Sequence, residues 1–351
     1  MKYPALLSFA EIVDQLELFD QIIDVRSPAE FALDHIPGAI NCPVLDNEER
    51  IKIGTMYKQV NAFEAKKVGA ALVAKNIATH IEQQFLSHPR DWKPLIYCWR
   101  GGNRSGSMAL ILAKIGWPVV QLDGGYKAFR QHINDEMPAL VGRFRYRVIC
   151  GTTGSGKSRL LQALQASGAQ VLDLEQLAVH RGSVLGEMPG ELQPSQKFFE
   201  SAIWNTLRHF DPAKVVYVES ESKKVGNLRV PAALIDRIRD ADCIHLQGAL
   251  DLRVALLMQE YVYFVDQPGE LMKRLHYLTA LYGKDKIRHW QDLVDQNSLE
   301  LLVRELLVDH YDPAYLRSIG RNFPQLDVAP VLHLSGITDQ DFLRLALELM
   351  A

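Results

Sequence analysis

The sequence predicts an α/β protein built from two consecutive units, each with a mostly parallel, doubly wound sheet, and with a helical C-terminal part. Short apolar runs end in polar residues, as buried strands do where they enter loops. Amphipathic stretches lie between these runs, and strands that alternate with helices form parallel sheets. A glycine-rich segment between a strand and a helix then starts the pattern again after residue 150.

In the first half, the patterns predict strands at 21–27, 93–99 and 118–125 and helices at 65–86 and 105–116. Residues 131–144 have a polar helical pattern that Pro138 and Gly142 punctuate, as expected for a connector. We therefore expect a first domain at 1–135, a linker at 136–145 and a second domain at 146–351.

In the second half, apolar runs predict strands at 146–150, 170–175, 214–220 and 243–248. The chain after residue 251 is mostly helical by pattern, with stretches at 252–264, 271–283, 298–311 and 341–350. A sheet followed by a long helical part is the architecture that this order predicts.

Length and composition are those of a globular protein of two ordinary domains. Of 351 residues, 48% are hydrophobic and 23% charged, and no apolar run is long enough to span a membrane. The N-terminus lacks signal-peptide features, and four dispersed cysteines lack metal-ligand spacing, so we expect a reducing, cytoplasmic location. The net charge of −3 gives no general attraction to nucleic acid, so RNA binding would need local basic patches.

Residues 151–158, GTTGSGKS, match the P-loop motif in full, between a strand and a helix. Backbone N–H groups and the helix N-terminus of such a loop hold a phosphate. We expect Lys157 to bridge phosphate oxygens and Ser158 to hold Mg²⁺ or a phosphate oxygen, with no cofactor tightly bound. The phosphate-binding residues predicted from the motif are Gly151, Gly154, Ser155, Gly156, Lys157 and Ser158.

An acidic partner for this loop is expected at the end of a neighbouring strand. Glu219 ends the run 214–220, where a metal-organising carboxylate usually lies, and Glu221 is the next choice. Asp173 and Glu175 end another strand, and either a structural role or contact with the metal or substrate is open for each acid.

Cys98 ends an apolar strand and precedes a helix, in the segment CWRGGNRSG. Backbone N–H groups and the helix dipole would favour the thiolate, and Arg100 and Arg104 add positive charge. Five residues separate Cys98 from Arg104, a pattern suited to attack on an anionic sulfur, selenium or phosphorus compound. A buried structural cysteine is the alternative, and it is the favoured reading for Cys42, Cys150 and Cys243.

Residues 22–44 and 119–129, with the Cys98 loop, resemble the signatures of rhodanese domains over about residues 5–133. The resemblance implies a rhodanese-like sheet in the first domain. Many single-domain rhodaneses have one residue fewer between cysteine and arginine, and the longer loop resembles that of related phosphatases and arsenate reductases, which hold tetrahedral oxyanions.

A rhodanese-like domain fused to a P-loop domain, with the segments DLEQLAVHRGSVLG and VYVESESKKVG, resembles the tRNA 2-selenouridine synthase family. The resemblance implies a transferase acting on 2-thiouridine at the wobble position of tRNA. It implies geranylation with geranyl diphosphate, then replacement of the S-geranyl group with selenium from selenophosphate. Cys98 corresponds to the family's cysteine, and the P-loop becomes a holder of diphosphate.

Other residues have two open readings. His180 and Arg181 could contact tRNA or the geranyl donor, or form a capping surface loop. Arg143, Arg145 and Arg147 alternate with aromatic residues, as in a phosphate-and-stacking stripe, although an edge strand with a solvated face is the favoured reading. The sequence offers a further candidate tRNA patch at Lys223, Lys224 and Arg229.

Two questions stay open at this point. Spacing does not locate a pocket for a ten-carbon chain; residues 256–264 are candidates, although core packing is the favoured explanation. One rival hypothesis for the whole chain is a sulfurtransferase or phosphatase coupled to a P-loop domain that binds ATP. Another is a kinase-like binding module with a non-catalytic rhodanese sensor, which the intact cysteine and arginine disfavour.

Overall fold

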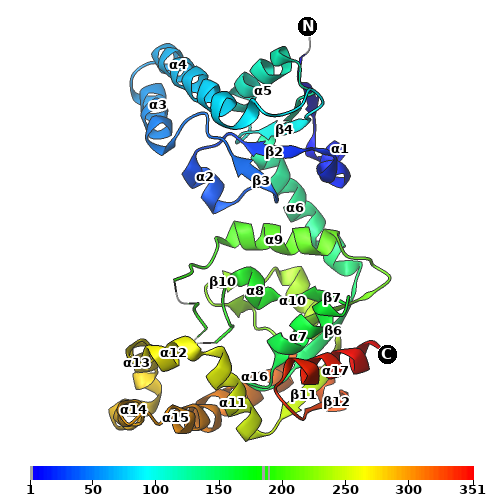
Figure 1. The fold of residues 1–351 in the computed structure, drawn as a ribbon, viewed down its shortest axis with the longest axis vertical. Coiled ribbons are helices and arrows are strands. Elements are labelled where there is room, and N and C mark those ends of the chain that lie inside the picture. The colour runs from blue at the N-terminus through cyan, green and yellow to red at the C-terminus, as the bar shows by residue number, and fades with distance from the viewer. Residues whose placement is uncertain (1–2, 184–185, 189) are drawn as a thin grey trace. The chain divides into compact units, whose positions relative to one another are not determined.

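The computed structural model describes residues 3–183, 186–188 and 190–351 (Figure 1). The chain divides into an N-terminal unit, residues 1–137 with 200–205, and a C-terminal unit, residues 138–199 with 206–351. The division after residue 137 falls inside a helix, α6 (Gly125–Gly142), so most of the expected linker is helical. Both units are α/β, as predicted, and no described helix is long and apolar enough to cross a membrane.

The N-terminal unit contains a five-stranded, fully parallel sheet in the order β1-β5-β4-β2-β3. Its strands are β1 (Ala5–Leu7), β2 (Gln21–Asp24), β3 (Ala39–Asn41), β4 (Pro94–Tyr97) and β5 (Val120–Leu122). The three strands expected from the sequence are β2, β4 and β5. The two edge strands, β1 and β3, were not expected: they are three residues long, like β5, but none of their residues is fully buried.

Helices of the N-terminal unit cover this sheet. They are α1 (Phe9–Ile12), η1 (Val13–Leu18), α2 (Pro28–Leu33), α3 (Asn47–Gln59), α4 (Ala62–His80), η2 (Ile81–Phe85), α5 (Asn103–Ile115) and the first part of α6. The apolar face of α5, including Met108 and Leu112, packs in one core with Ile23 and Ile96 of the sheet. This packing fixes α5 directly after the central strand β4.

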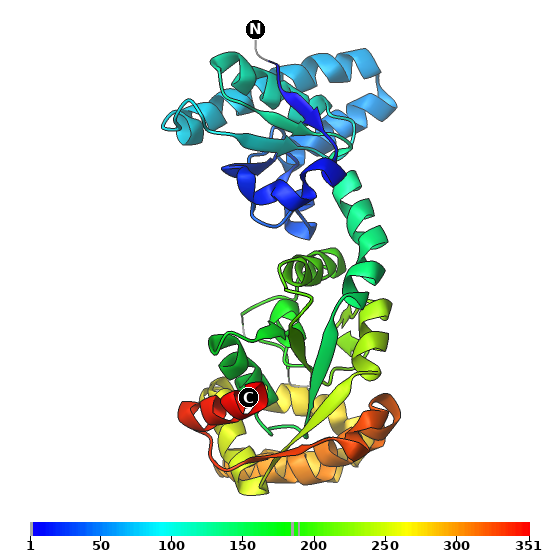
Figure 2. The ribbon, with the colours of Figure 1, turned by 90° about the vertical axis from the view of Figure 1, so that its right-hand side faces the viewer.

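The C-terminal unit has a second five-stranded parallel sheet, in the order β12-β11-β6-β8-β7 (Figure 2). Its strands are β6 (Arg145–Cys150), β7 (Gln170–Leu172), β8 (Val215–Glu219), β11 (Asp242–Gly248) and β12 (Val331–Leu334), beside a small antiparallel hairpin of β9 (Lys224–Val225) and β10 (Leu228–Arg229). The edge strand β12 lies in the part of the chain that was expected to be mostly helical.

The remaining helices surround the second sheet and extend into a helical part. They are α7 (Lys157–Ala166), α8 (Leu174–Ala178), α9 (Gln196–Arg208), α10 (Ala232–Arg239), α11 (Leu250–Glu260), α12 (Val262–Asp266), α13 (Pro268–Leu275), η3 (His276–Leu278), α14 (Thr279–Asp295), α15 (Leu299–Glu305), η4 (Leu306–Tyr311), α16 (Asp312–Asn322), η5 (Pro324–Val328) and α17 (Asp339–Met350). The C-terminal helix α17, red in Figure 2, packs against α7. Residues from α13, α14 and α15 form a separate apolar core of the helical part.

One expectation about β6 is wrong. The alternation of arginines with aromatic residues was read as an edge strand with a solvated face, but β6 is the central strand, between β11 and β8. Phe144 and Tyr146 are buried, so their rings pack in the interior and are not available to stack on RNA bases. The pattern misled because arginines at a strand's start remain exposed even when the strand itself is central.

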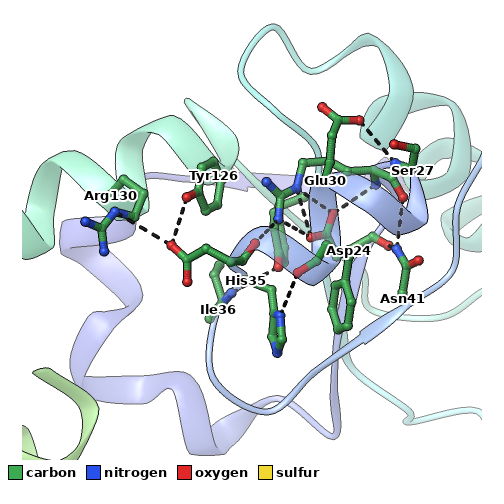
Figure 3. Close-up of polar contacts among 12 residues, drawn as sticks. Asp24, Ser27, Glu30, His35, Ile36, Asn41, Tyr126 and Arg130 are labelled. Carbon is green, nitrogen blue, oxygen red and sulfur yellow. Dashed lines mark hydrogen bonds and ion pairs between the residues drawn. The ribbon is translucent and has the colours of Figure 1, made fainter. Parts of the chain in front are cut away.

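A buried polar network ties the strands of the N-terminal unit together (Figure 3). Arg26 is 1% exposed, and its Nη2 donates to Asp24 Oδ2 and to the Asp34 carbonyl oxygen, both at 2.6 Å. Its guanidinium carbon lies 4.0 Å from the ring centre of Tyr126, whose hydroxyl donates to Asp34 Oδ2 at 2.8 Å. A buried charge pair needs such hydrogen bonds to offset its desolvation.

We expect Arg26→Ala to destabilise the N-terminal unit by about 3–5 kcal/mol, because it leaves the Asp24 carboxylate buried without its cation. The measurement is the free energy of opening from hydrogen exchange of amides in β2 and β4. Lys67→Ala is the control, since it breaks an ion pair with Glu64 whose side chains are 54% and 48% exposed; that loss should stay below about 1 kcal/mol. Equal effects of the two substitutions would contradict this prediction.

Candidate functional site

The P-loop lies between the central strand β6 and the N-terminus of α7. Gly156 precedes the helix with φ +87°, and a Cβ there would come within 2.6 Å of the Phe342 ring. Only glycine combines this left-handed conformation with such close packing. The loop is therefore held by α17 and leaves its amide groups at the end of α7, where a helix favours an anion.

Lys157 and Ser158 have different hydrogen-bond partners. The Lys157 ammonium donates to the Gly151 carbonyl oxygen at 2.9 Å, and the Ser158 hydroxyl donates to Glu175 Oε2 at 3.3 Å. Among the described residues, the buried Ser155 hydroxyl has no hydrogen-bond partner. All six predicted phosphate-binding residues thus lie in this loop or at the start of α7, and the Ser155 hydroxyl remains available for a further hydrogen bond.

Three carboxylates gather beside this loop. Glu175 of α8, Glu219 at the end of β8 and Glu221 just after it each have an oxygen within 4.8 Å of the others. Glu219 is 1% exposed, and neither of its oxygens has a hydrogen-bond partner among the described residues. Asp173, one of the expected acids, instead accepts the Gln176 backbone N–H at 2.8 Å and caps α8.

Burial and mutual repulsion keep protons on this cluster. Burial, followed by the neighbouring acids, raises the pKa of Glu219 well above its usual range. Burial raises the pKa of Glu221 to about 8 and that of Glu175 to about 7, against the opposing charge of Lys157. Carboxylates this close cannot all ionise without a cation to compensate them.

The same residues fit a divalent cation. Carboxylate oxygens are the ligands that Mg²⁺ prefers. Neither oxygen of buried Glu219 has a hydrogen-bond partner among the described residues, and one of them lies within 4.8 Å of an oxygen of each of the other two acids. Glu175, Glu219 and Glu221 would hold the ion, with the Ser158 hydroxyl next to them. From the sequence, Glu219 and Glu221 were preferred, and Glu175 was considered only beside Asp173 at the end of a strand. The structure places Glu175 in α8, within reach of the other two acids.

A polar cavity connects the loop and the acids with the segment after α8. His180 and Arg181 both line it. His180 Nδ1 accepts the Gly182 backbone N–H at 3.0 Å, and burial lowers the pKa of the imidazole. Arg181 lies 4.7 Å from the Tyr261 ring centre and 3.5 Å from Glu260 Oε2. The structure thus brings both residues to the cavity that holds the P-loop.

The basic residues considered only for contact with tRNA are not among the residues that line this cavity. Lys223 and Lys224 are exposed at the start of the β9–β10 hairpin, two and three positions after Glu221. Arg143 and Arg145 are exposed at the start of β6, and β6 enters the P-loop only at its other end. The strand's length therefore separates these two arginines from the cradle, whereas the lysines follow the acid cluster directly.

The N-terminal unit has a second loop of the same design. Cys98 follows β4, and α5 begins at Asn103, so the intervening residues form the turn into a helix N-terminus. Cys98 is 3% exposed, and its Sγ accepts the Ser105 hydroxyl at 3.4 Å. The sulfur therefore lies in the turn before a helix N-terminus, where free backbone N–H groups attract an anionic ligand.

The start of α6 holds the Cys98 loop through two backbone hydrogen bonds. The backbone N–H groups of Tyr126 and Lys127 donate to the carbonyl oxygens of Cys98 at 2.8 Å and Trp99 at 3.0 Å. Gly125 has φ +54°, and a Cβ on it would collide with the Cys98 carbonyl. The second glycine of the pair in this rhodanese-like signature, Gly125, is thus required by the cysteine loop that it contacts.

The two arginines of the cysteine loop differ. Arg104 is paired: its Nη1 donates to Glu30 Oε2 at 2.8 Å and its Nη2 to Glu30 Oε1 at 3.3 Å. Arg100 is exposed. Arg104 therefore contributes a neutralised pair beside the loop, and Glu30, from the first rhodanese-like signature, is a partner that its spacing from Arg104 did not reveal.

We expect the metal-free C-terminal unit to lose stability between about pH 5 and about pH 8.5. Glu175 and Glu221 have raised pKa values when folded, so the folded state binds more protons than the unfolded state there, and stability falls as pH rises. Calorimetry should show a melting temperature lower by several degrees, since each kcal/mol shifts it by about 2–4 °C. Glu221→Gln should flatten this slope, and Glu300→Gln, on an exposed residue, should not.

Two protein-family models and several known relatives match this chain. A family model described as tRNA 2-selenouridine synthase AAA domain matches residues 144–326, and one described as Rhodanese-like domain matches residues 8–132. The tRNA 2-selenouridine synthase of Sulfurovum sp. (strain NBC37-1) is 32% identical over 332 residues, covering 86% of this chain and 89% of the relative. That of Alcanivorax borkumensis is 33% identical over 347 residues, covering 88% and 92%. With both predicted domains matched, the chain belongs to the tRNA 2-selenouridine synthase family of transferase enzymes.

Proposed function

We propose that this protein converts 2-thiouridine at the wobble position of tRNA into 2-selenouridine in two steps. In the first, geranyl diphosphate alkylates the sulfur; in the second, selenophosphate supplies selenium that replaces the S-geranyl group. The observation that supports this most directly is that the chain has two separate loops, Cys98–Gly102 and Gly151–Gly156, each of which runs from the middle strand of a sheet into a helix N-terminus. Two anionic donors require two such sites.

For the first step, the P-loop amides and Lys157 would hold the diphosphate. The thiouridine sulfur attacks C1 of the geranyl group, the C1–O bond breaks, and diphosphate leaves with the electron pair while the base loses its N3 proton. When bound, Mg²⁺ would neutralise charge on the leaving diphosphate. Lys157 would supply a cation to the same oxygens, since it lines the cavity that holds the loop.

For the second step, the Cys98 loop would hold selenophosphate, whose tetrahedral anion suits a ring of backbone N–H groups. Selenium attacks C2 of the base, the C2–S bond breaks, and geranylthiol departs. Hydrolysis of the P–Se bond then releases phosphate. Alkylation in the first step makes this possible, because a thioether sulfur leaves more readily than a thiocarbonyl sulfur.

The direct test of the function is nucleoside analysis of tRNA from cells that lack this protein. Loss of 2-selenouridine together with accumulation of 2-thiouridine is the expected result. Unchanged 2-selenouridine would overturn the proposal, and turnover of thiosulfate or phosphate esters by the purified protein, without conversion of tRNA, would favour the sulfurtransferase or phosphatase hypothesis.

Lys157→Ala should slow geranylation of 2-thiouridine tRNA and weaken binding of geranyl diphosphate. A hydrogen bond from a charged group contributes about 1.5–3 kcal/mol, which corresponds to roughly 10- to 100-fold in affinity. Lys214→Ala, on an exposed lysine of the same unit, is the matched control. Normal geranylation and affinity in Lys157→Ala would remove the P-loop from the first step.

Cys98→Ser should block formation of 2-selenouridine and leave geranylation intact, so that S-geranyl-2-thiouridine accumulates. Ser107→Ala, on an exposed hydroxyl of α5, should leave both steps unchanged. Mass spectrometry of the protein after incubation with selenophosphate distinguishes a covalent role for Cys98 from a positioning role. A selenium adduct that is absent from Cys98→Ser indicates the covalent role, and loss of geranylation in this variant would contradict the division of labour.

A further inference from the structure

A second, strongly apolar cavity lies in the C-terminal unit, among the helices that follow the sheet. Helices α11, α12, α13 and α15 and the π-helical turn η4 supply its walls. π-helical turns occur frequently at functional sites, because the extra residue widens the helix locally. Its interior is lined by the side chains of Met258, Phe264, Leu271, Leu299, Val303 and Leu306.

This apolar cavity lies next to the P-loop cavity and shares part of its wall with it. Thr153, Leu257 and Tyr261 are among the residues that line both, and Thr153 belongs to the P-loop itself. Leu257 Cγ lies 3.0 Å from the position of a Cβ on Gly154, so α11 packs directly on the loop. A group attached directly to a phosphate in the loop is therefore close enough to enter the apolar cavity.

Arg253 holds this junction in place. Its Nε donates to the Thr153 carbonyl oxygen at 2.9 Å, and its Nη1 and Nη2 donate to the Asp312 carboxylate at 2.9 and 2.6 Å. Arg253 is 6% exposed. The bidentate pair thus links the P-loop with α11, which carries Arg253, and with α16, which begins at Asp312.

The lining of the apolar cavity selects among the groups that can be attached to a diphosphate. A nucleoside needs hydrogen bonds for its base and ribose, and a buried polar group without partners binds poorly. Hydrocarbon side chains make up nearly all of the interior, and hydrocarbon gains affinity in such a site with each methylene removed from water. The cavity suits a hydrocarbon tail and not a nucleoside.

We infer that this apolar cavity holds the hydrocarbon of the P-loop's diphosphate ligand, and that its interior side chains determine which chain length is accepted. This inference rests on the proposed function for the identity of the ligand, and it adds the residues that recognise the tail. Residues 256–264, considered from the sequence as core, contribute Leu257, Met258, Tyr261 and Phe264 to the lining.

The test compares geranyl diphosphate with inorganic diphosphate by calorimetry in the presence of Mg²⁺. The native protein should bind geranyl diphosphate at least about tenfold more tightly, because only that ligand removes hydrocarbon from water. Val303→Phe should bring the ratio of the two affinities close to one and leave inorganic diphosphate binding unchanged. Val308→Phe is the matched control, since Val308 is 50% exposed and should preserve the ratio.

A second variant tests the opposite change. Leu306→Ala should enlarge the interior and shift preference toward the fifteen-carbon farnesyl diphosphate, measured as the ratio of its affinity to that of geranyl diphosphate. Unchanged binding of inorganic diphosphate shows that each variant retains a folded cradle. A native protein that binds both diphosphates equally, or a Val303→Phe variant with an unchanged ratio, would overturn the inference.

These outcomes separate the inference from the proposed function. Tight geranyl diphosphate binding that depends on Val303, without geranylation of 2-thiouridine tRNA, would retain the cavity's role and refute the function. Geranylation of tRNA without any preference for geranyl over inorganic diphosphate would retain the function and refute the cavity's role.

Discussion

A single geometric constraint underlies both loops: in a parallel sheet, a strand's carboxyl end leads into the N-terminus of the next helix. The loops of Cys98 and Gly151 both follow the middle strand of a five-stranded sheet, β4 in one unit and β6 in the other. The free N–H groups at such a helix start attract negative charge before any side chain contributes. Because the middle strand is buried on both faces, its carboxyl end is fixed in the sheet, and so is the position of the N–H groups that follow it.

Each loop is then shaped by contacts from distant parts of the chain. In the C-terminal unit, Phe342 of α17 fills the space beside Gly156, and Arg253 of α11 holds the Thr153 carbonyl. In the N-terminal unit, the start of α6 donates two hydrogen bonds to the carbonyl oxygens of Cys98 and Trp99. The chemistry of the loops is local, whereas their rigidity comes from segments that a motif does not include.

This division explains how far the sequence could predict the structure. The central strands and their loops could be predicted because long apolar runs and glycine spacing are local signals. The predicted fold class is confirmed for the same reason. The three-residue strands β1 and β3 and the late strand β12 depend on pairing with neighbours, which no local pattern encodes. Similarly, Glu219 was predicted from its strand end, but the approach of Glu175, and of Glu30 to Arg104, arises only when separate elements pack.

The contact between Gly125 and the Cys98 carbonyl has a consequence for how such a chain can change over evolutionary time. Any side chain at position 125 would collide with the backbone of a loop that precedes it by more than twenty positions. A mutation at position 125 and a change in the backbone path of Cys98 and Trp99 are therefore not independent. A redesign of the cysteine loop for another donor has to keep the space that the start of α6 occupies, so the two segments are altered together or not at all.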